Sequence, residues 1–546
     1  MKACSLIVSS WAMPSTKHPL LYSVLSALLF SAAWIFHFAF FAFFAFIPLL
    51  MLRSALPQKS ALRHFWYVYV AFFLWNLSVT WWVAYASFSG ACLAIILNSL
   101  LMSFVFAFFT AMRQKIKHVM SVWLLVPIWV AWEYGHSVWD LTWTWLSIGN
   151  VFAFHPNWVQ WFEYTGTSGG SVWILCTNIF VYQSLCSQAG LKFRSAFPYR
   201  LAALFVAPIL LSYTIFMLKS RPQNPDVEVV MVQPNVDPYN EKFSLDFRSQ
   251  FEKMLGLVRG KISPQTDYLV LPETFITENL NEAHLTDAVE IQWFKDSLLH
   301  HYPGLKIISG ANTYVLFDKN DPAIPATARE DKRGFYFDVY NSAIQIDSTG
   351  VQVYHKSKLV PGVERMPFPA LMKPLEKFAI DLGGTMGSLG TQAHRTVLWD
   401  ESHTHAIAPV ICYESIFSDY VTEYVRTGAD FLFILTNDGW WDNSPGYKQH
   451  LNYARLRAIE NRRTIARCAN TGISCFINPF GRLSDESSWW TEAVLVKKIE
   501  ANAELTFFSR HGDLLSYTAS LFSLMLLPYW LYLRFSLGKY TRRLRT

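Results

Sequence analysis

The chain has 546 residues, of which 52% are hydrophobic and only 16% are charged. It is therefore too long for one ordinary domain and too apolar for a wholly soluble protein. The net charge of +6 comes without a basic stripe interleaved with aromatic residues, so it does not indicate a nucleic-acid-binding protein. The apolar runs predict three parts: a transmembrane bundle at 1–220, a globular domain at 221–515, and a last span with a basic tail at 516–546.

The first and last parts consist of apolar runs long enough for a bilayer, which takes roughly 20 residues per helix. The stretch 20–52 has no formal charge and predicts a two-helix hairpin. A cleaved signal peptide, the other interpretation of this stretch, has an apolar core of only about 7–15 residues. A buried core helix is the alternative for any single run, but Trp and Tyr at the run ends favour a membrane bundle. We therefore expect eight spans, the remaining six near 63–83, 91–112, 119–138, 169–188, 200–218 and 517–535.

The short loops predict how this bundle is oriented. With eight spans, the loops that contain Lys or Arg all fall on one side with both termini, whereas 85–90 and 137–169 contain neither residue. The positive-inside rule makes the basic side the cytoplasm. The large domain is then expected on the periplasmic face of a bacterial inner membrane. Glu133, near the outer end of the fifth span, is expected to pair with a neighbouring helix or a lipid headgroup, because an unpartnered ionisable group there is costly.

From residue 226 onward, short apolar strands alternate with amphipathic helices, which predicts a layered α/β domain. The charged stretch 318–333 is expected to be a surface loop. Expected strands lie at 227–233, 268–272, 305–314, 340–346, 406–412 and 431–436, with a strand pair within 464–478. Expected helices lie at 243–261, 291–300, 419–427 and 447–463.

Glu273 is the first residue of this domain that suggests chemistry. It follows the strand segment 268–272, and Pro272 cannot donate a hydrogen bond to a sheet, so the strand is expected to end there. The carboxylate would then sit at the rim of the sheet. It could act as a general base there or, equally, cap the next element.

Lys356 lies in the segment 351–362, directly after Tyr354 and His355. The ordinary role of Lys356 or of the nearby Lys358 is a solvated surface charge. A buried ammonium beside a thiol would instead favour the thiolate and hold an oxyanion. Such a scheme requires no histidine, so His355 and His450 are expected to be structural.

Cys412 closes an apolar strand and precedes a turn. A strand-to-turn junction exposes a side chain, and the N–H groups of the turn can face a developing oxyanion. A packed core thiol is the alternative, but the adjacent Glu414 favours a functional role because an acidic residue directly after a core strand needs a partner. Cys468 and Cys475 are expected to be buried reduced thiols, and a disulfide between them stays open.

Three segments together resemble one enzyme family. Leu271-Pro272-Glu273-Thr274, Tyr354-His355-Lys356 and Cys412-Tyr413-Glu414, at these separations, are similar to the motifs of the nitrilase or carbon–nitrogen hydrolase superfamily. The resemblance implies an αββα sandwich, a triad of Glu273, Lys356 and Cys412, and no cofactor or metal. It also implies supporting or substrate-binding roles for Glu364, Tyr413, Glu414 and Trp440. The match departs at 361–363 and around 239–243, which leaves the shape of both loops open.

With spans before and after the domain, the whole chain resembles the membrane-embedded acyltransferases of that superfamily. The resemblance implies that Cys412 takes a fatty acyl chain from a phospholipid, expected to be phosphatidylethanolamine. The chain would then pass to the N-terminal amine of diacylglyceryl-cysteine on apolipoproteins, the final step of bacterial lipoprotein maturation. The residues that would admit acyl chains, unless they simply pack, are Phe368, Leu371, Met372, Trp440 and Trp441. A membrane-tethered amidase or nitrilase acting on soluble amides and a non-catalytic scaffold or transporter are the alternatives, and a monomer is the default.

Overall fold

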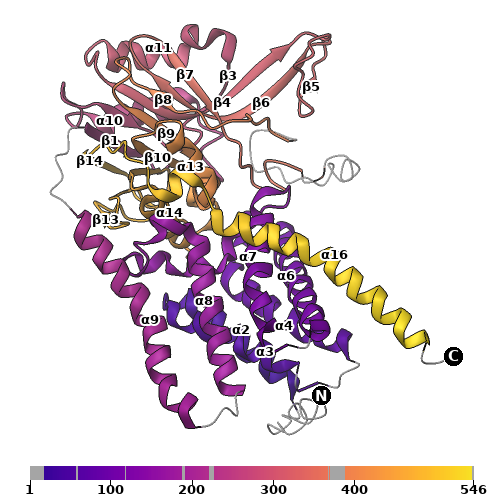
Figure 1. Ribbon diagram of the computed structural model, residues 1–546. Helices are drawn as coiled ribbons and strands as arrows, with labels where there is room; N and C mark the ends of the chain where they lie inside the picture. The colour runs from indigo at the N-terminus through magenta and orange to yellow at the C-terminus, as the bar shows by residue number, and fades with distance from the viewer. Residues whose placement is uncertain are drawn as a thin grey trace.

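The structure is a computed structural model that describes residues 18–53, 55–56, 60–116, 118–186, 191–220, 227–366, 368 and 388–543. An α/β domain is stacked on one end of a helical bundle (Figure 1). Residues 221–226, where the first expected domain boundary falls, lie outside the described residues. The helices of the bundle are α2 (Pro19–Ile35), α3 (Ile47–Leu52), α4 (Ala61–Thr80), α5 (Val83–Ala86), α6 (Phe88–Ile116), α7 (Leu125–Val138), α8 (Phe162–Cys186), α9 (Leu191–Lys219) and α16 (Leu514–Arg543).

Among the described residues, three helices are long and apolar enough to cross a membrane, namely Phe88–Ile116, Tyr199–Lys219 and Leu514–Tyr532. The eight expected spans are therefore not all present as long apolar helices. The expected hairpin at 20–52 forms two shorter apolar limbs. Helix α4 buries His64 and Asn76, which lower its hydropathy, and α8 bends at Gly166, where φ is +63°. The count of eight spans remains a prediction.

The α/β domain consists of two sheets packed face to face. The order is β14-β1-β2-β4-β6-β5 in the first sheet, with β3 on β4 and β7 on β6, and β13-β12-β11-β10-β9-β8 in the second. The ring of Tyr268 meets that of Phe433 edge-on at 5.4 Å between the sheets. The strands are β1 (Val227–Gln233), β2 (Tyr268–Val270), β3 (Ile276–Asn281), β4 (Lys306–Phe317), β5 (Arg329–Glu330), β6 (Tyr336–Ile346), β7 (Val351–His355), β8 (Leu398–Trp399), β9 (Ala406–Ile411), β10 (Phe431–Thr436), β11 (Thr464–Ala469), β12 (Cys475–Ile477), β13 (Leu483–Ser484) and β14 (Ala493–Ile499).

Helices complete the four layers. Apolar residues of α10 (Phe247–Val258) and α11 (Val289–Phe294) pack with strand residues of the first sheet in one buried cluster. Helices α13 (Ser418–Arg426) and α14 (Pro445–Asn461) pack beside the second sheet. The expected αββα arrangement is present, and strand-to-strand hydrogen bonding has added β3, β5, β7, β8, β13 and β14, which the sequence pattern did not indicate.

Helix α14 joins the domain to the bundle. The Tyr453 hydroxyl on α14 accepts a hydrogen bond from the Trp34 indole (3.1 Å), and the Gln449 side chain accepts one from Trp145 (2.6 Å). Just beyond α14, Arg462 pairs with the buried carboxylate of Glu163 on α8 at 2.7 Å. Removing one partner of a buried ion pair is strongly destabilising, so these contacts fix the domain on the bundle.

Cys468 and Cys475 are both buried free thiols. The Cys468 thiol lies between the two sheets, where it approaches the carbonyl oxygens of Val232 (3.2 Å) and Val270 (3.3 Å). The structure therefore shows two reduced thiols, and not the disulfide that the sequence left open as an alternative.

Candidate active site

Cys412 occupies a strained position directly after β9. Its φ is +45°, and it begins a short 3-10 turn that runs to Ile416. The left-handed region costs a residue with a Cβ roughly 1–2 kcal/mol, so surrounding contacts must hold it. The side chain is 9% exposed and faces a cavity.

Glu414 supplies those contacts. Its fully buried carboxylate accepts hydrogen bonds from the backbone N–H of Ile411 and of Ser357, each at 2.8 Å. It also accepts bonds from the hydroxyls of three tyrosines, Tyr354 (2.7 Å), Tyr420 (2.6 Å) and Tyr424 (3.2 Å). Glu414 does not line the cavity in front of Cys412. Its expected partner proves to be a set of neutral donors, which tie the Cys412 turn to the loop after β7.

That loop carries Lys356, whose side chain is 1% exposed. The ammonium lies between two carboxylates, 2.9 Å from Glu273 and 2.8 Å from Glu364. The amide of Asn341 on β6 donates to the same two groups, at 2.9 and 3.2 Å. Glu364 also accepts the N–H of Val360 at 2.8 Å, which closes the loop after Lys356. Asn341 had no assigned role in the sequence, because a polar residue inside a strand gives no chemical signal.

The charges of this cluster determine the resting state. Burial and the nearby Glu273 carboxylate raise the pKa of the Cys412 thiol. Burial also acts to raise the pKa of Glu273, but the Lys356 ammonium outweighs it and holds that pKa below its ordinary value. Despite burial, the two carboxylates hold the pKa of Lys356 well above its usual range. At rest the thiol is therefore neutral beside an ionised glutamate, which can accept the thiol proton during attack.

Gly310 sets the position of Glu273. A Cβ at Gly310 on β4 would lie 2.3 Å from the Thr274 nitrogen and 2.6 Å from the Glu273 Cα. Thr274 itself has φ of +47°. The chain thus turns away from the sheet directly after Glu273, and only a glycine on the neighbouring strand allows this close approach. A glycine within a strand pattern was the available signal.

A second lysine, Lys242, also reaches the site. Its side chain is buried, and its ammonium donates to the backbone oxygen of Glu273 at 2.8 Å. Burial lowers its pKa to about 8. The same loop is held by the Tyr239 hydroxyl, which contacts the carbonyl oxygens of Trp440 (2.8 Å) and Tyr85 (3.3 Å). The segment 239–243, whose shape the sequence left open, thus lies beside the site, with Phe243 in the lining of the cavity and Lys242 on the backbone of Glu273. The sequence did not single out Lys242.

His450 lies behind the turn, in the structural position expected for it. Its ring contacts the Cys412 carbonyl (3.1 Å) and the Asp438 carboxylate (2.9 Å), and all three groups are buried. Arg467 in turn contacts Asp438 at 2.6 Å. This network supports the backbone of Cys412 from the side away from the cavity.

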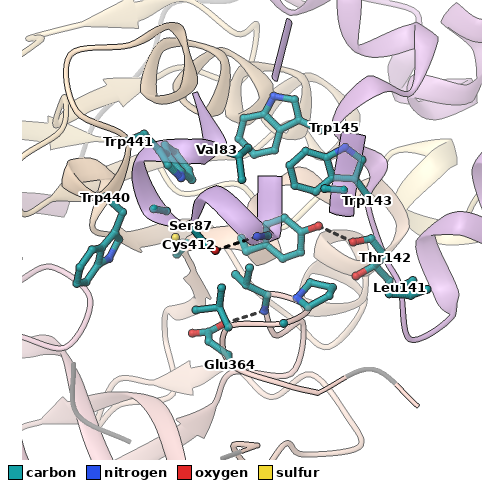
Figure 2. Close-up of a pocket in the computed structure, with 18 of the residues that line it drawn as sticks. Val83, Ser87, Leu141, Thr142, Trp143, Trp145, Glu364, Cys412, Trp440 and Trp441 are labelled. Atoms are coloured by element: carbon teal, nitrogen blue, oxygen red, sulfur yellow. Dashed lines mark hydrogen bonds between the residues drawn. The ribbon is translucent and has the colours of Figure 1, made fainter. Parts of the chain in front are cut away.

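A cavity of about 330 Å³ in front of Cys412 joins the domain to the bundle (Figure 2). From the domain it is lined by Glu273, Lys356, Glu364, Cys412, Tyr413, Trp440 and Trp441. From the bundle it is lined by one face of α6, with Gly90, Leu93, Ala94, Leu97 and Leu101, and by Val83 and Ser87. The Tyr413 hydroxyl donates to Thr142 of the bundle at 2.8 Å, so its role is to hold the cavity wall.

Of the five residues expected to admit acyl chains, Trp440 and Trp441 line this cavity. Phe368 is 39% exposed and lies against Trp139, at 6.1 Å between ring centroids. Leu371 and Met372 lie outside the described residues.

Comparison with known proteins agrees with both halves of the chain. A sequence model described as carbon-nitrogen hydrolase matches residues 229–505, and one described as apolipoprotein N-acyltransferase N-terminal domain matches residues 10–180. The apolipoprotein N-acyltransferase of Chlorobaculum tepidum is 30% identical over 462 residues, which cover 82% of this chain and 84% of that protein. The enzyme of the same name from Thermotoga maritima is 25% identical over 72% of this chain and 68% of its own. The chain therefore belongs to the carbon–nitrogen hydrolase family and, within it, to the apolipoprotein N-acyltransferases.

Proposed function

We propose that this protein transfers a fatty acyl chain from a membrane phospholipid to the N-terminal amine of diacylglyceryl-cysteine on apolipoproteins. The cavity that joins Cys412 to the bundle is the observation that carries this proposal. Its bundle wall is an apolar helix face, Leu93, Leu97 and Leu101 among its residues, which suits an acyl chain. A soluble amide would need no such wall.

In the first half-reaction, the Cys412 sulfur attacks the ester carbonyl of the phospholipid and Glu273 accepts the thiol proton. The Lys356 ammonium stabilises the charge that develops on the carbonyl oxygen. The ester C–O bond then breaks, Glu273 returns the proton to the leaving oxygen, and a lysophospholipid departs. The acyl chain remains on Cys412 as a thioester.

In the second half-reaction, the lipoprotein amine attacks the thioester and gives a proton to Glu273. The C–S bond breaks and the proton returns to the Cys412 sulfur, so the enzyme is regenerated and the acceptor carries an amide. Glu364 keeps Lys356 charged and in place through both halves. No cofactor or metal enters these steps, and phosphatidylethanolamine is the proposed donor.

The proposed topology places eight spans in a bacterial inner membrane. The bundle comprises 1–220, the catalytic domain on the periplasmic face comprises 221–515, and the last span with its basic tail comprises 516–546. The three long apolar helices support membrane insertion. The basic loops support the orientation. We also propose that the protein acts as a monomer.

The test supplies phosphatidylethanolamine liposomes and a synthetic diacylglyceryl-cysteine lipopeptide to the purified protein. The lipopeptide should gain one fatty acyl group as an amide, with an equal amount of lysophosphatidylethanolamine released. Cys412→Ala should produce neither. Hydrolysis of small soluble amides without acylation of the lipopeptide would favour the membrane-tethered amidase and refute the proposal.

A further inference from the structure

A second cavity, of about 250 Å³, lies on the other side of the Cys412–Ile416 turn, where the domain meets α7 and the start of α16. Unlike the catalytic cavity, it is lined mainly by polar and charged side chains. The residues that matter for its chemistry are Lys358, Arg395, Tyr420, Glu133 and Asp513. Lys358, Arg395 and Tyr420 have no part in the proposed acyl transfer.

Two cations on the domain side face this cavity without a carboxylate partner among the described residues. The Lys358 ammonium donates to the carbonyl of Ser137 (2.7 Å) and lies over the rings of Phe417 (5.0 Å) and Tyr420 (5.8 Å). Arg395 is 9% exposed, stacks on the ring of Tyr420 at 4.3 Å and donates through Nη2 to the carbonyl oxygens of Gln392 (3.3 Å) and Ala393 (2.5 Å). Its buried Nε has no hydrogen-bond partner among the described residues. A buried guanidinium with a free donor is costly unless a ligand accepts from it.

The two cations also lie close enough to repel each other. Burial, followed by the charge of Arg395, lowers the pKa of Lys358 to about 8. The other cations that line the cavity are already paired, Arg457 with Glu460 at 2.6 Å and Arg426 with Asp419 at 3.4 Å. An anion placed between Lys358 and Arg395 would relieve their repulsion.

The opposite wall carries carboxylates that have no cation among the described residues. Glu133 accepts from the Ser171 hydroxyl (2.6 Å), the Ile148 N–H (2.7 Å) and the Trp129 indole (3.1 Å). Asp513 accepts from the hydroxyls of Ser168 and Ser516, each at 2.7 Å. Glu423, the remaining acidic residue of the lining, lies on the domain side and contributes favourably to the charge of Arg395. The cavity therefore has the cations Lys358 and Arg395 on its domain wall and the carboxyl groups of Glu133 and Asp513 on the opposite wall.

We propose that this cavity binds the headgroup of a zwitterionic phospholipid, with its phosphate on Arg395 and Lys358 and its ammonium toward Asp513 and Glu133. Exposed apolar residues beside the cavity favour a lipid over a free ion: Val138 in the lining is 57% exposed, and Leu514, next to Asp513, is 43% exposed. Acyl chains can lie on such apolar residues while the headgroup stays in the polar cavity. The volume suits a headgroup, since pockets for whole drug-sized ligands measure about 300–1,000 Å³.

This site is separate from the catalytic cavity but is connected to it. Arg395 stacks on Tyr420, and the Tyr420 hydroxyl donates to Glu414, which holds the Cys412 turn. A headgroup bound to Arg395 would thus be linked through Tyr420 and Glu414 to the turn that holds Cys412. The proposal needs only a membrane environment and does not depend on the acyl-transfer function.

The test counts bound lipids by native mass spectrometry of the full chain in detergent, in a Cys412→Ala background that prevents turnover. Titration with phosphatidylethanolamine should show a saturable second lipid. Arg395→Gln should weaken the binding of that second lipid by about tenfold or more, because charged hydrogen bonds to phosphate are the strong ones. Arg248→Gln, which changes an arginine with a 69% exposed side chain on α10, should leave lipid binding unchanged.

Two further arms identify the ligand. Asp513→Asn keeps the acceptor for the Ser516 N–H but removes the charge, so it should reduce the preference for phosphatidylethanolamine over phosphatidylglycerol. Inorganic phosphate should fail to displace the second lipid. Displacement by inorganic phosphate at similar concentrations would indicate a free-anion site and overturn the proposal.

Thermal unfolding of each variant shows whether it is folded. If Arg395→Gln does not fold, binding of the second lipid is compared in Arg395→Lys and Asp513→Asn instead. Arg395→Lys retains the charge but not the forked donors, so it should weaken binding less than the loss of charge does. Unchanged binding of the second lipid in every folded variant would overturn the proposal, and it would do so whether or not the wild-type protein acylates the lipopeptide.

Discussion

Gly310→Ala should slow acyl transfer by displacing Glu273, the proposed general base, while the side chains of Glu273, Lys356 and Cys412 all stay unchanged. The added Cβ would lie 2.3 Å from the Thr274 nitrogen and 2.6 Å from the Glu273 Cα, whereas ordinary contacts begin at 3.4 Å. Both neighbours are backbone, so the chain at Glu273 must move by about 1 Å. A displacement of that size in a catalytic group costs roughly 100-fold in rate, or about 3 kcal/mol of barrier. Crowding of the core should also lower the free energy of unfolding by about 1–3 kcal/mol.

The assay is the initial rate of lipopeptide acylation, with thermal unfolding measured on the same preparation. Gly256→Ala on α10 is the matched control, because nothing lies within 4 Å of a Cβ there. That change should leave the rate unaltered and stabilise the helix by about 0.5–1 kcal/mol. Acylation by Gly310→Ala within threefold of the wild-type rate would refute the inference that β4 fixes the catalytic position of Glu273.

Three other predictions follow from the contacts around the triad. Glu414→Gln replaces one carboxylate oxygen, which accepts hydrogen bonds, with an NH₂ group, which cannot accept them. The variant should lose about 3 kcal/mol of unfolding free energy and all acylation activity. An unchanged denaturant midpoint would contradict this role of Glu414. Tyr239→Phe removes the hydroxyl contacts to the Trp440 and Tyr85 carbonyls and should slow acylation by about 2- to 10-fold at unchanged thermal stability; an unchanged rate would contradict a role of these contacts in holding the segment 239–243 at the site. Burial lowers the pKa of Lys242 from 10.5 to about 8. Between about pH 8 and 10.5 the folded protein therefore binds fewer protons than the unfolded chain, and the free energy of unfolding rises with pH. Lys242→Met should therefore stabilise the protein at pH 7 by on the order of 3 kcal/mol, a gain that shrinks as pH rises from about 8 to about 10.5; a gain independent of pH would contradict the assignment.

Two of the residues proposed for the chemistry, Glu273 and Cys412, could be placed from the sequence because each follows a predicted strand. Glu273 comes after Pro272, and Cys412 follows the apolar strand β9, so local pattern places both at a rim. The supporting residues were not predictable in the same way. Asn341 and Gly310 lie inside strands, where their roles depend on residues far away in the chain.

The fold shows the same division. Strands β1 and β10 occupy the expected residues, because apolar and β-branched runs of that length have few other uses. Strand β14 was not predicted because Lys497 and Lys498 interrupt its apolar pattern. It forms a strand by pairing antiparallel with β1. In the bundle, composition alone overestimated the regularity of the helices, since α4 buries the polar residues His64 and Asn76 and α8 bends at Gly166, which lies against the ring of Phe508.

The central claim, that Cys412 carries the acyl chain, is tested most directly by intact-mass analysis after incubation with phosphatidylethanolamine liposomes and no acceptor. The wild-type protein should gain the mass of one fatty acyl group, and hydroxylamine should remove it, because a thioester is labile to that nucleophile. Cys412→Ser should show no such thioester. A wild-type protein that stays unmodified under these conditions, yet hydrolyses small amides, would contradict the claim.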